Sequence, residues 1–269
     1  MKKDSSPLQL DWSAVSDVGR VRRNNEDSWG VFVPAQGAFP VTQEEIAMGA
    51  GGVLLLVSDG MGGAQGGEEA SRFCIERCAQ EIAHRHDRHD HAAVVREAMT
   101  VTHVALLARA QSRNSWRGMG ATLSALWLHA NGTGVVGHIG DSRVYQRHGG
   151  KLRQLTEDHN LGAGMVRRGE MTEEAVTRFK YRSMLEQVMG GDGRVLEPQL
   201  VPVKLAAGDC FALCSDGLFG PLRDNTDQLM ARALQEAGLA GAAQSLVDAA
   251  NAAGGQDNVT VLLARVVAG

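Results

Sequence analysis

The stretch from Val53 to Gly63 constrains the fold of this chain more than any other part of its sequence. Val53 to Val57 are five consecutive apolar residues, too few to span a membrane and typical of a β-strand that is buried on both faces. Ser58 and Asp59 follow, at the point where such a strand leaves the core. Glycines, which allow backbone conformations barred to other residues, come next as Gly60, Gly62, Gly63, Gly66 and Gly67. The pattern predicts a strand, a turn and a helix, with a carboxylate at the strand end that suits a hard divalent cation.

Three other kinds of turn resemble this stretch. A tight strand-to-helix turn with a solvated Asp is the simplest. A dinucleotide-binding turn also lies between a strand and a helix, but Asp59 would repel the pyrophosphate. The ribose-binding acid expected about twenty residues later would be Glu81, which falls in a helical pattern. Because no Lys follows the glycines, the phosphate-binding P-loop fails as well, and we do not expect a nucleotide site.

The composition is that of an ordinary globular protein, with 43% hydrophobic and 22% charged residues among 269. With no internal repeat and no flexible linker, we expect one domain that covers residues 1–269. The formal net charge of −4 argues against a nucleic acid or an anionic membrane as a partner. Met1–Pro7 contains no apolar segment of a signal peptide, and no apolar run reaches membrane length. The sequence therefore predicts a cytoplasmic protein, which we expect to be a monomer.

Cysteines and histidines raise the question of a second type of metal site. The four cysteines form two pairs, Cys74/Cys78 at helical spacing and Cys210/Cys214 on one face of a predicted strand. A zinc site is one interpretation, and buried reduced cysteines are the one we favour. The His-rich tract 84–91 could also bind metal, but we interpret it as a polar connection between two helices.

Hydrophobic periodicity predicts an α+β protein in which sheets pack on each other and helices cover them. Residues 118–155 read as an antiparallel meander with a hairpin turn at Asn131-Gly132, and residues 34–52 read as a long surface excursion. A short-helix excursion is expected within 158–181. The other strands are expected at 8–18, 28–33, 199–203, 210–214 and 259–266, and the helices at about 66–83, 92–110, 226–235 and 240–252.

Acidic residues recur at predicted corners of the chain, each beside Gly or Asn or next to another acid. They are Glu26-Asp27, Asp59-Gly60, Gly140-Asp141, Asp216-Gly217 and Asp257-Asn258. A single Asp-Gly is most simply a turn. If the sheets bring all five corners together, however, the carboxylates would repel one another unless divalent cations neutralise them. An all-oxygen set without His points to Mg²⁺ or Mn²⁺ rather than to zinc.

Six motifs occur in one order between residues 16 and 266. They are Ser16-Asp17-Val18-Gly19 through Asn25-Glu26-Asp27, Val57-Ser58-Asp59-Gly60-Met61-Gly62-Gly63, Gly118-Met119-Gly120-Ala121-Thr122, Gly140-Asp141-Ser142-Arg143, Cys214-Ser215-Asp216-Gly217-Leu218 and Gln256-Asp257-Asn258-Val259-Thr260. Together they resemble the metal-dependent protein phosphatases, the PPM or type 2C serine/threonine phosphatases, and most closely the bacterial branch. The resemblance implies a four-layer α-β-β-α sandwich of two mainly antiparallel sheets flanked by helices. It also implies a flap segment near 159–190.

The resemblance further implies a centre of two Mn²⁺ or Mg²⁺ ions at one end of the sandwich, with a third, weaker ion held in part by Asp141. Asp27 would orient a water bound to the ions, and Arg22, five residues before it, would bind the phosphate. Arg20 and Arg23 are expected to be structural or surface residues. The ligands of the two main ions, direct or through water, would be Glu26, Asp59, Gly60 through its carbonyl, Asp216 and Asp257.

By this resemblance the chain would hydrolyse phosphoserine and phosphothreonine monoesters through a water shared by two ions, with no covalent intermediate. Its partners would be phosphorylated proteins, the substrates of a Hanks-type Ser/Thr kinase. A catalytically silent interaction module of the same fold is the alternative. Two departures concern the rim of the site: Met61 stands where animal members have His, and Gln187-Val188-Met189-Gly190 differs from the usual end of the flap. Substrate choice is least predictable there.

Overall fold

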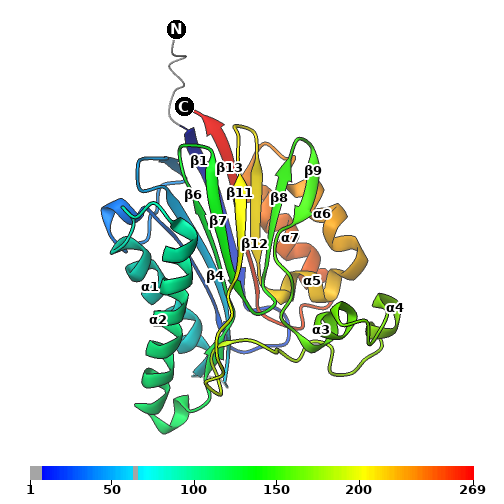
Figure 1. The fold of residues 1–269 in the computed structure, drawn as a ribbon. Helices are drawn as coiled ribbons and strands as arrows, with labels where there is room; N and C mark the ends of the chain where they lie inside the picture. Colours follow the sequence, from blue (N-terminus) through cyan, green and yellow to red (C-terminus); the bar gives the residue numbers. More distant parts are fainter. Residues whose placement is uncertain (1–7, 63–65) are drawn as a thin grey trace.

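The computed structural model of this chain describes residues 8–62 and 66–269. Met1–Pro7, in which we expect no signal peptide, and Gly63 of the glycine-rich turn lie outside the described residues. Two sheets lie face to face in the middle of the molecule, and helices cover both outer faces (Figure 1). The predicted four-layer α-β-β-α sandwich is therefore confirmed.

The first sheet joins the two ends of the described chain. Its central pair is β1, Leu8–Asp17, against β13, Val259–Ala268, with ten residue pairs in antiparallel register. In spatial order its strands are β3 (Glu45–Ala47), β1, β13, β12 (Cys210–Cys214), β8 (Arg143–His148) and β9 (Lys151–Gln154).

The second sheet is built around β4, Val53–Met61, which contains the predicted buried strand. In spatial order its strands are β10 (Met189–Gly190), β5 (Gly120–Ala121), β4, β6 (Leu123–Leu128), β7 (Thr133–Ile139) and β11 (Gln199–Lys204), and β2 (Asp27–Phe32) pairs with β4. Among the described residues, every strand pairing in both sheets is antiparallel.

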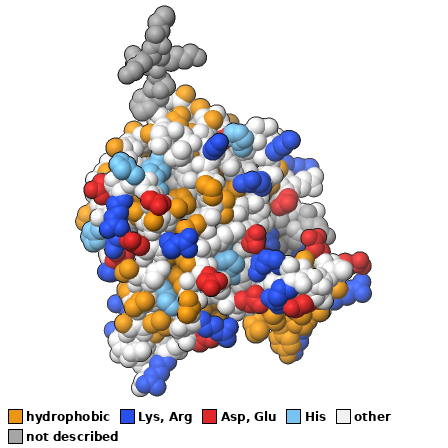
Figure 2. Space-filling model, in the orientation of Figure 1, with side chains coloured by type: hydrophobic (Ala, Val, Ile, Leu, Met, Phe, Trp, Pro, Cys, Tyr) orange, Lys and Arg blue, Asp and Glu red, His pale blue; other side chains and the backbone are white. Residues whose placement is uncertain are grey.

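Helices α1, Gly66–Ala83, and α2, His91–Gln111, cover the second sheet. The first sheet is covered by α5 (Asp216–Leu222), α6 (Thr226–Ala233) and α7 (Leu239–Ala252). Helices α3, Leu161–Arg167, and α4, Glu173–Val176, protrude at one end within the predicted flap segment. Acidic and basic side chains are mixed on this protrusion and over the face that Figure 2 shows. None of the described helices is long and apolar enough to cross a membrane.

The layers are held by three apolar clusters, one between the sheets and one under each helical layer. Strand β4 contributes to two of them. Leu54 and Leu56 pack in the cluster under α1 and α2, whereas Leu55 and Val57 pack between the sheets. All four side chains are fully buried, so the predicted strand with two buried faces is confirmed.

Two local predictions were wrong, and one helix was not predicted. Residues 118–155 are not one meander, because the chain leaves β7 in the second sheet and enters β8 in the first at the Gly140–Ser142 corner, where Gly140 has a φ of +101°. Residues 34–52 are not only a surface excursion, since β3 pairs with β1 and Met48 is buried. Helix α5 was not expected, because Gly217, Gly220 and Pro221 within it are poor helix formers.

The cysteines are reduced and buried, as predicted. Cys74 and Cys78 pack under α1 and α2, whereas Cys210 and Cys214 pack under α5 to α7, so the two pairs lie in different helix-sheet layers. A zinc site shared by all four is therefore wrong. The His-rich tract connects α1 to α2, as expected, and only its last member, His91, begins the second helix.

Candidate active site

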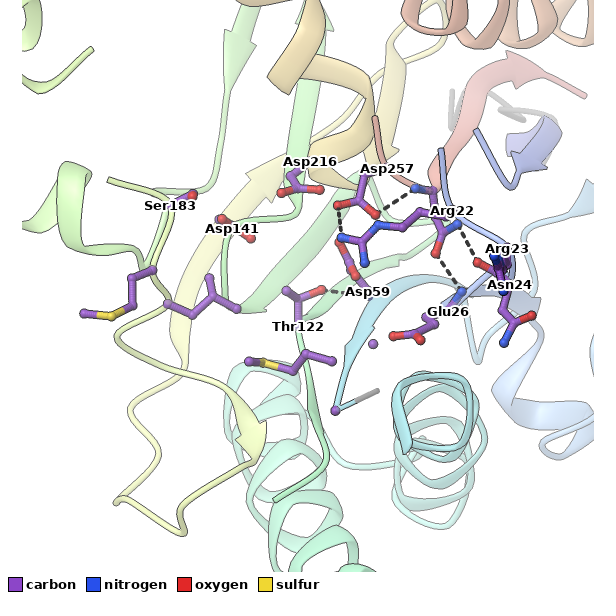
Figure 3. A pocket seen from close by; sticks show the side chains of 16 residues that line it. Arg22, Arg23, Asn24, Glu26, Asp59, Thr122, Asp141, Ser183, Asp216 and Asp257 are labelled. Atoms are coloured by element: carbon purple, nitrogen blue, oxygen red, sulfur yellow. Dashed lines mark hydrogen bonds and ion pairs between the residues drawn. The ribbon is translucent and has the colours of Figure 1, made fainter. Parts of the chain in front are cut away.

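Five of the predicted acidic residues face one cavity of about 560 Å³, whose wall includes Leu185, bridged to Asn160 at the start of α3. They are carried by five separate parts of the chain, and Figure 3 shows them around the same space. The acids are Glu26 from the β1–β2 loop, Asp59 from β4, Asp141 from the corner before β8, Asp216 from the first turn of α5 and Asp257 from the loop before β13. Gly60 and Arg22 line the cavity too. Asp27 lies beside them, because it pairs with Asp59 across β2 and β4.

Glycine is needed at Gly60 and Gly67 because other backbone and side-chain atoms lie too close for a Cβ. A Cβ added to Gly67 would overlap the Glu26 carboxylate, and one added to Gly60 would overlap the carbonyl of Gly67. Glycine at both positions therefore allows Glu26 to lie against the start of α1 and beside the end of β4.

Asp59 is held at its backbone by Thr122. The Asp59 N–H donates to Thr122 Oγ1 at 2.9 Å, and the Thr122 N–H donates to the Asp59 carbonyl at 2.8 Å. Thr122 Oγ1 is also hydrogen-bonded to Ser142 Oγ at 2.7 Å. This residue therefore fixes the β4 end and the corner that carries Asp141 relative to each other.

The Asp27 side chain is positioned from the opposite sheet. Ser215 Oγ donates to Asp27 Oδ2 at 2.7 Å and accepts from the Thr260 N–H at 3.0 Å. The other oxygen, Asp27 Oδ1, is buried without a hydrogen-bond partner, and so is Asp216 Oδ1. A buried carboxylate oxygen without a partner is costly, so both atoms have capacity to bind a ligand.

The carboxylates raise one another's pKa. Burial is the main cause, and it raises the pKa of Asp27 to about 7, that of Asp141 to about 8 and that of Asp216 to about 6. Burial, and then the charge of Asp27, also raise the pKa of Asp59 well above its ordinary value. Such an excess of buried negative charge is what bound cations relieve.

Arg22 brings a positive charge to the cavity. Its Nη2 donates to Asp257 Oδ2 at 2.7 Å, and the side chain is 54% exposed (Figure 3). This hydrogen bond raises the pKa of the Arg22 guanidinium. Arg22 is predicted to bind phosphate and Asp257 to bind an ion. In this structure the two side chains form an ion pair with each other.

The residue types fit Mg²⁺ or Mn²⁺, since they offer oxygen ligands and two of these oxygens lack a partner. In the described part of the chain, no three or more His, Cys, Asp and Glu side chains are arranged to hold an ion as they stand. The oxygen ligands therefore suit Mg²⁺ or Mn²⁺. The side chains, however, line a wide cavity and do not surround one position for an ion.

Three residues that contact the predicted acids were not among the predicted site residues, although they stand in the six motifs. Thr122, Ser215 and Asn258 each contact a predicted acid or its backbone. The sequence indicates Ser215 and Asn258 by their position, since each stands next to a predicted acid, Asp216 or Asp257. The cavity wall formed by Ser183, Met184 and Leu185 has no such signal.

Comparison with known proteins gives one consistent result. Residues 42–250 match the family model described as Protein phosphatase 2C. The serine/threonine protein phosphatase PstP of Mycobacterium tuberculosis is 36% identical over 97% of this chain, which spans 46% of the length of that relative. The serine/threonine phosphatase stp of Listeria welshimeri is 31% identical, and the match covers 92% of both proteins.

Comparison with solved structures also finds bacterial serine/threonine phosphatases. The crystal structure of the M. tuberculosis phosphatase PstP/Ppp matches with a TM-score of 0.79 at 34% identity, covering 96% of this chain and 99% of the other. The catalytic domain of PstP, solved in complex with two manganese ions, matches with a TM-score of 0.78, also at 34% identity, over 97% of this chain and 99% of that domain.

Proposed function

We propose that this chain, which belongs to the protein phosphatase 2C family, removes phosphate from phosphoserine and phosphothreonine side chains of proteins. The observation that carries the proposal is the buried carboxylate cluster itself. Asp27, Asp59, Asp141 and Asp216 all have a raised pKa, and two of their oxygens have no hydrogen-bond partner. Folding this much negative charge into one place is unfavourable unless cations bind there.

Two Mn²⁺ or Mg²⁺ ions are the cofactors that fit, as in the manganese complex of the PstP catalytic domain. We propose that Glu26, Asp59, Asp216, Asp257 and the carbonyl of Gly60 hold them, and that Asp141 helps to hold a third. When bound, such ions neutralise charge on the phosphoryl oxygens and lower the pKa of water towards neutrality.

The chain's own residues have distinct tasks in this proposal. The planar guanidinium of Arg22 can donate two parallel hydrogen bonds to phosphate oxygens, which a Lys cannot match. Its bond to Asp257 uses only Nη2, so the other N–H groups of the guanidinium are left to donate to phosphate. Asp27, fixed by Ser215 through Oδ2, has Oδ1 available to orient the attacking water. No side chain needs to form a bond to phosphorus.

Phosphorylated proteins are the partners that the relatives' activity implies, and we propose in addition that they are substrates of a Hanks-type Ser/Thr kinase. We also propose that the chain works in the cytoplasm as a monomer, without a nucleic acid or a membrane as partner. The net charge of −4 supports the absence of nucleic acid. Co-purification with a kinase substrate and the mass measured by light scattering test these points.

The test of the activity is release of phosphate from a phosphothreonine peptide, with Mn²⁺ and with a chelator. We expect turnover with Mn²⁺ only, and Asp59→Asn should reduce kcat by orders of magnitude while the protein stays folded. The matched control is Asp248→Asn, the same change on the exposed face of α7, which should behave as wild type. Absence of Mn²⁺-dependent turnover in the wild type would favour the silent interaction module instead.

A further inference from the structure

A second cavity, which we call the side pocket, adjoins the carboxylate cavity. Its volume is about 380 Å³, which is within the range of ligand pockets. Met61 and Leu185 line both cavities, so the two share a wall. The side pocket lies between the end of β4 and the segment that flanks β10, and its other apolar lining side chains are Val188, Val195 and Leu196.

Hydrogen bonds on both sides of β10 fix the walls of the side pocket. The Gly191 N–H donates to the Met119 carbonyl at 2.9 Å, and the Gly190 N–H donates to His103 Nδ1 at 3.0 Å. Beyond β10, the Glu197 N–H donates to Gln187 Oε1 at 3.0 Å. Because these walls are formed in advance, a ligand would spend little binding free energy on ordering them.

The chemistry of the side pocket favours an apolar occupant. Val195 is 86% exposed and Met61 is 42% exposed, so apolar surface faces solvent here. The charged residues of the lining already have partners of opposite charge: Arg194 pairs with Asp192 at 2.8 Å, and Glu186 pairs with Arg168 at 3.4 Å. A charged ligand side chain would meet a charge of its own sign in each pair, whereas an apolar one would only displace water.

We infer that the side pocket binds an apolar side chain of the phosphoprotein substrate, close in sequence to the phosphorylated Ser or Thr. The inference rests on the proposed function, which places the phosphate among the carboxylates. A substrate chain that extends from there over Met61 and Leu185 reaches the side pocket directly. The pocket then selects among phosphorylation sites by the residue beside them.

The experiment uses phosphothreonine peptides with alanine flanks in which leucine replaces each flanking alanine in turn. For each enzyme the readout is the ratio of kcat/KM for a leucine peptide to that for the all-alanine peptide. We expect a ratio of about ten or more at one flanking position in the wild type. Val195→Glu, which puts a charge on the exposed wall, should bring that ratio to about one. The matched control Val104→Glu, on the exposed face of α2, should keep the wild-type ratio.

A wild-type ratio near one at every position would overturn the inference, and so would a ratio that persists in Val195→Glu. Hydrolysis of p-nitrophenyl phosphate, which has no flanking residues, keeps this result separate from the proposed function. If the wild type hydrolyses that ester with Mn²⁺, only the side pocket is in question. If it hydrolyses neither that ester nor the peptides, the phosphatase activity fails and the inference fails with it.

Discussion

The side chain of Asn258 accepts a 2.8 Å hydrogen bond from the backbone N–H of Glu26, 232 residues away in sequence. Its Nδ2 donates to the carbonyls of Val18 and Asn24, at 3.0 and 2.8 Å. One buried amide therefore ties the loop that carries Arg22 and Glu26 to the strand that follows Asp257. We regard Asn258 as a positioning residue, since it acts on the predicted ion ligands through the backbone.

Replacing Asn258 by Ala should both destabilise the protein and weaken ion binding. Losing a buried side chain with three hydrogen bonds should cost about 1–3 kcal/mol, or several degrees of Tm. Because the loop carrying Glu26 would be released, Mn²⁺ affinity should fall about tenfold or more by calorimetry. Asn131→Ala, which removes hydrogen bonds to Thr133 in an exposed hairpin, is the control. It should cost stability without changing Mn²⁺ affinity, and equal affinities in the two variants would contradict the positioning role.

Arg22→Ala should act mainly on substrate binding. Charge-assisted hydrogen bonds to phosphate are made with substrate and transition state alike, so we expect KM for a phosphopeptide to rise about tenfold or more. Inhibition by free phosphate should weaken in parallel, while Mn²⁺ affinity stays nearly intact because the change frees Asp257. Arg23→Ala, which alters the adjacent residue of the same cavity wall, should have a much smaller effect. Equal KM values for the two variants would remove Arg22 from its assigned role.

The carboxylate cluster predicts how the stability of the metal-free protein depends on pH. The folded pKa is about 7 for Asp27 and about 8 for Asp141, whereas unfolded aspartates have a pKa of about 3.9. Between about pH 6.5 and 8 the folded state therefore binds more protons than the unfolded state, and stability must fall as pH rises. We expect a decrease of a few degrees in Tm across this window, measured by calorimetry with a chelator present.

Buried histidines also change stability with pH, but in a lower pH range than the carboxylates. Burial lowers the pKa of His129 to about 4 and that of His138 to about 3, so these groups reduce stability only below their unfolded pKa of about 6.5. Saturating Mn²⁺ should flatten the pH dependence above pH 6.5, and Asp141→Asn should reduce it. A metal-free Tm that rises between pH 6.5 and 8 would show that the carboxylates do not repel one another as we describe.

The fold and the acids that line the cavity were predictable because their signals are local. Five consecutive apolar residues predict that strand β4 is buried. Asp59, Asp216 and Asp257 stand in short motifs beside Gly or Asn. Helix α5 was missed because tertiary contact outweighs its poor helix propensity: Gly217 lies against the backbone of Asn258 where no Cβ would fit. The side pocket was not predictable either, since its walls come from Met61 and residues 185–196, which only the folded chain brings together.

Asp141→Ala distinguishes a structural corner from an outer ion ligand. Asp141 is buried and accepts a long hydrogen bond, at 3.3 Å, from the side-chain nitrogen Nδ2 of Asn160. A turn-stabilising Asp looks different: Asp209 accepts from the Ala206 N–H at 3.0 Å, so Asp209→Ala should lower Tm and leave kcat unchanged.

Removing Asp141 instead removes a repelled charge, so the metal-free Tm should stay the same or rise. The tightly bound Mn²⁺ should be retained, whereas kcat should fall because Asp141 would hold the third ion. Calorimetry, Mn²⁺ stoichiometry and kcat on one preparation decide the matter, and a lower Tm with normal kcat would make Asp141 a corner residue only.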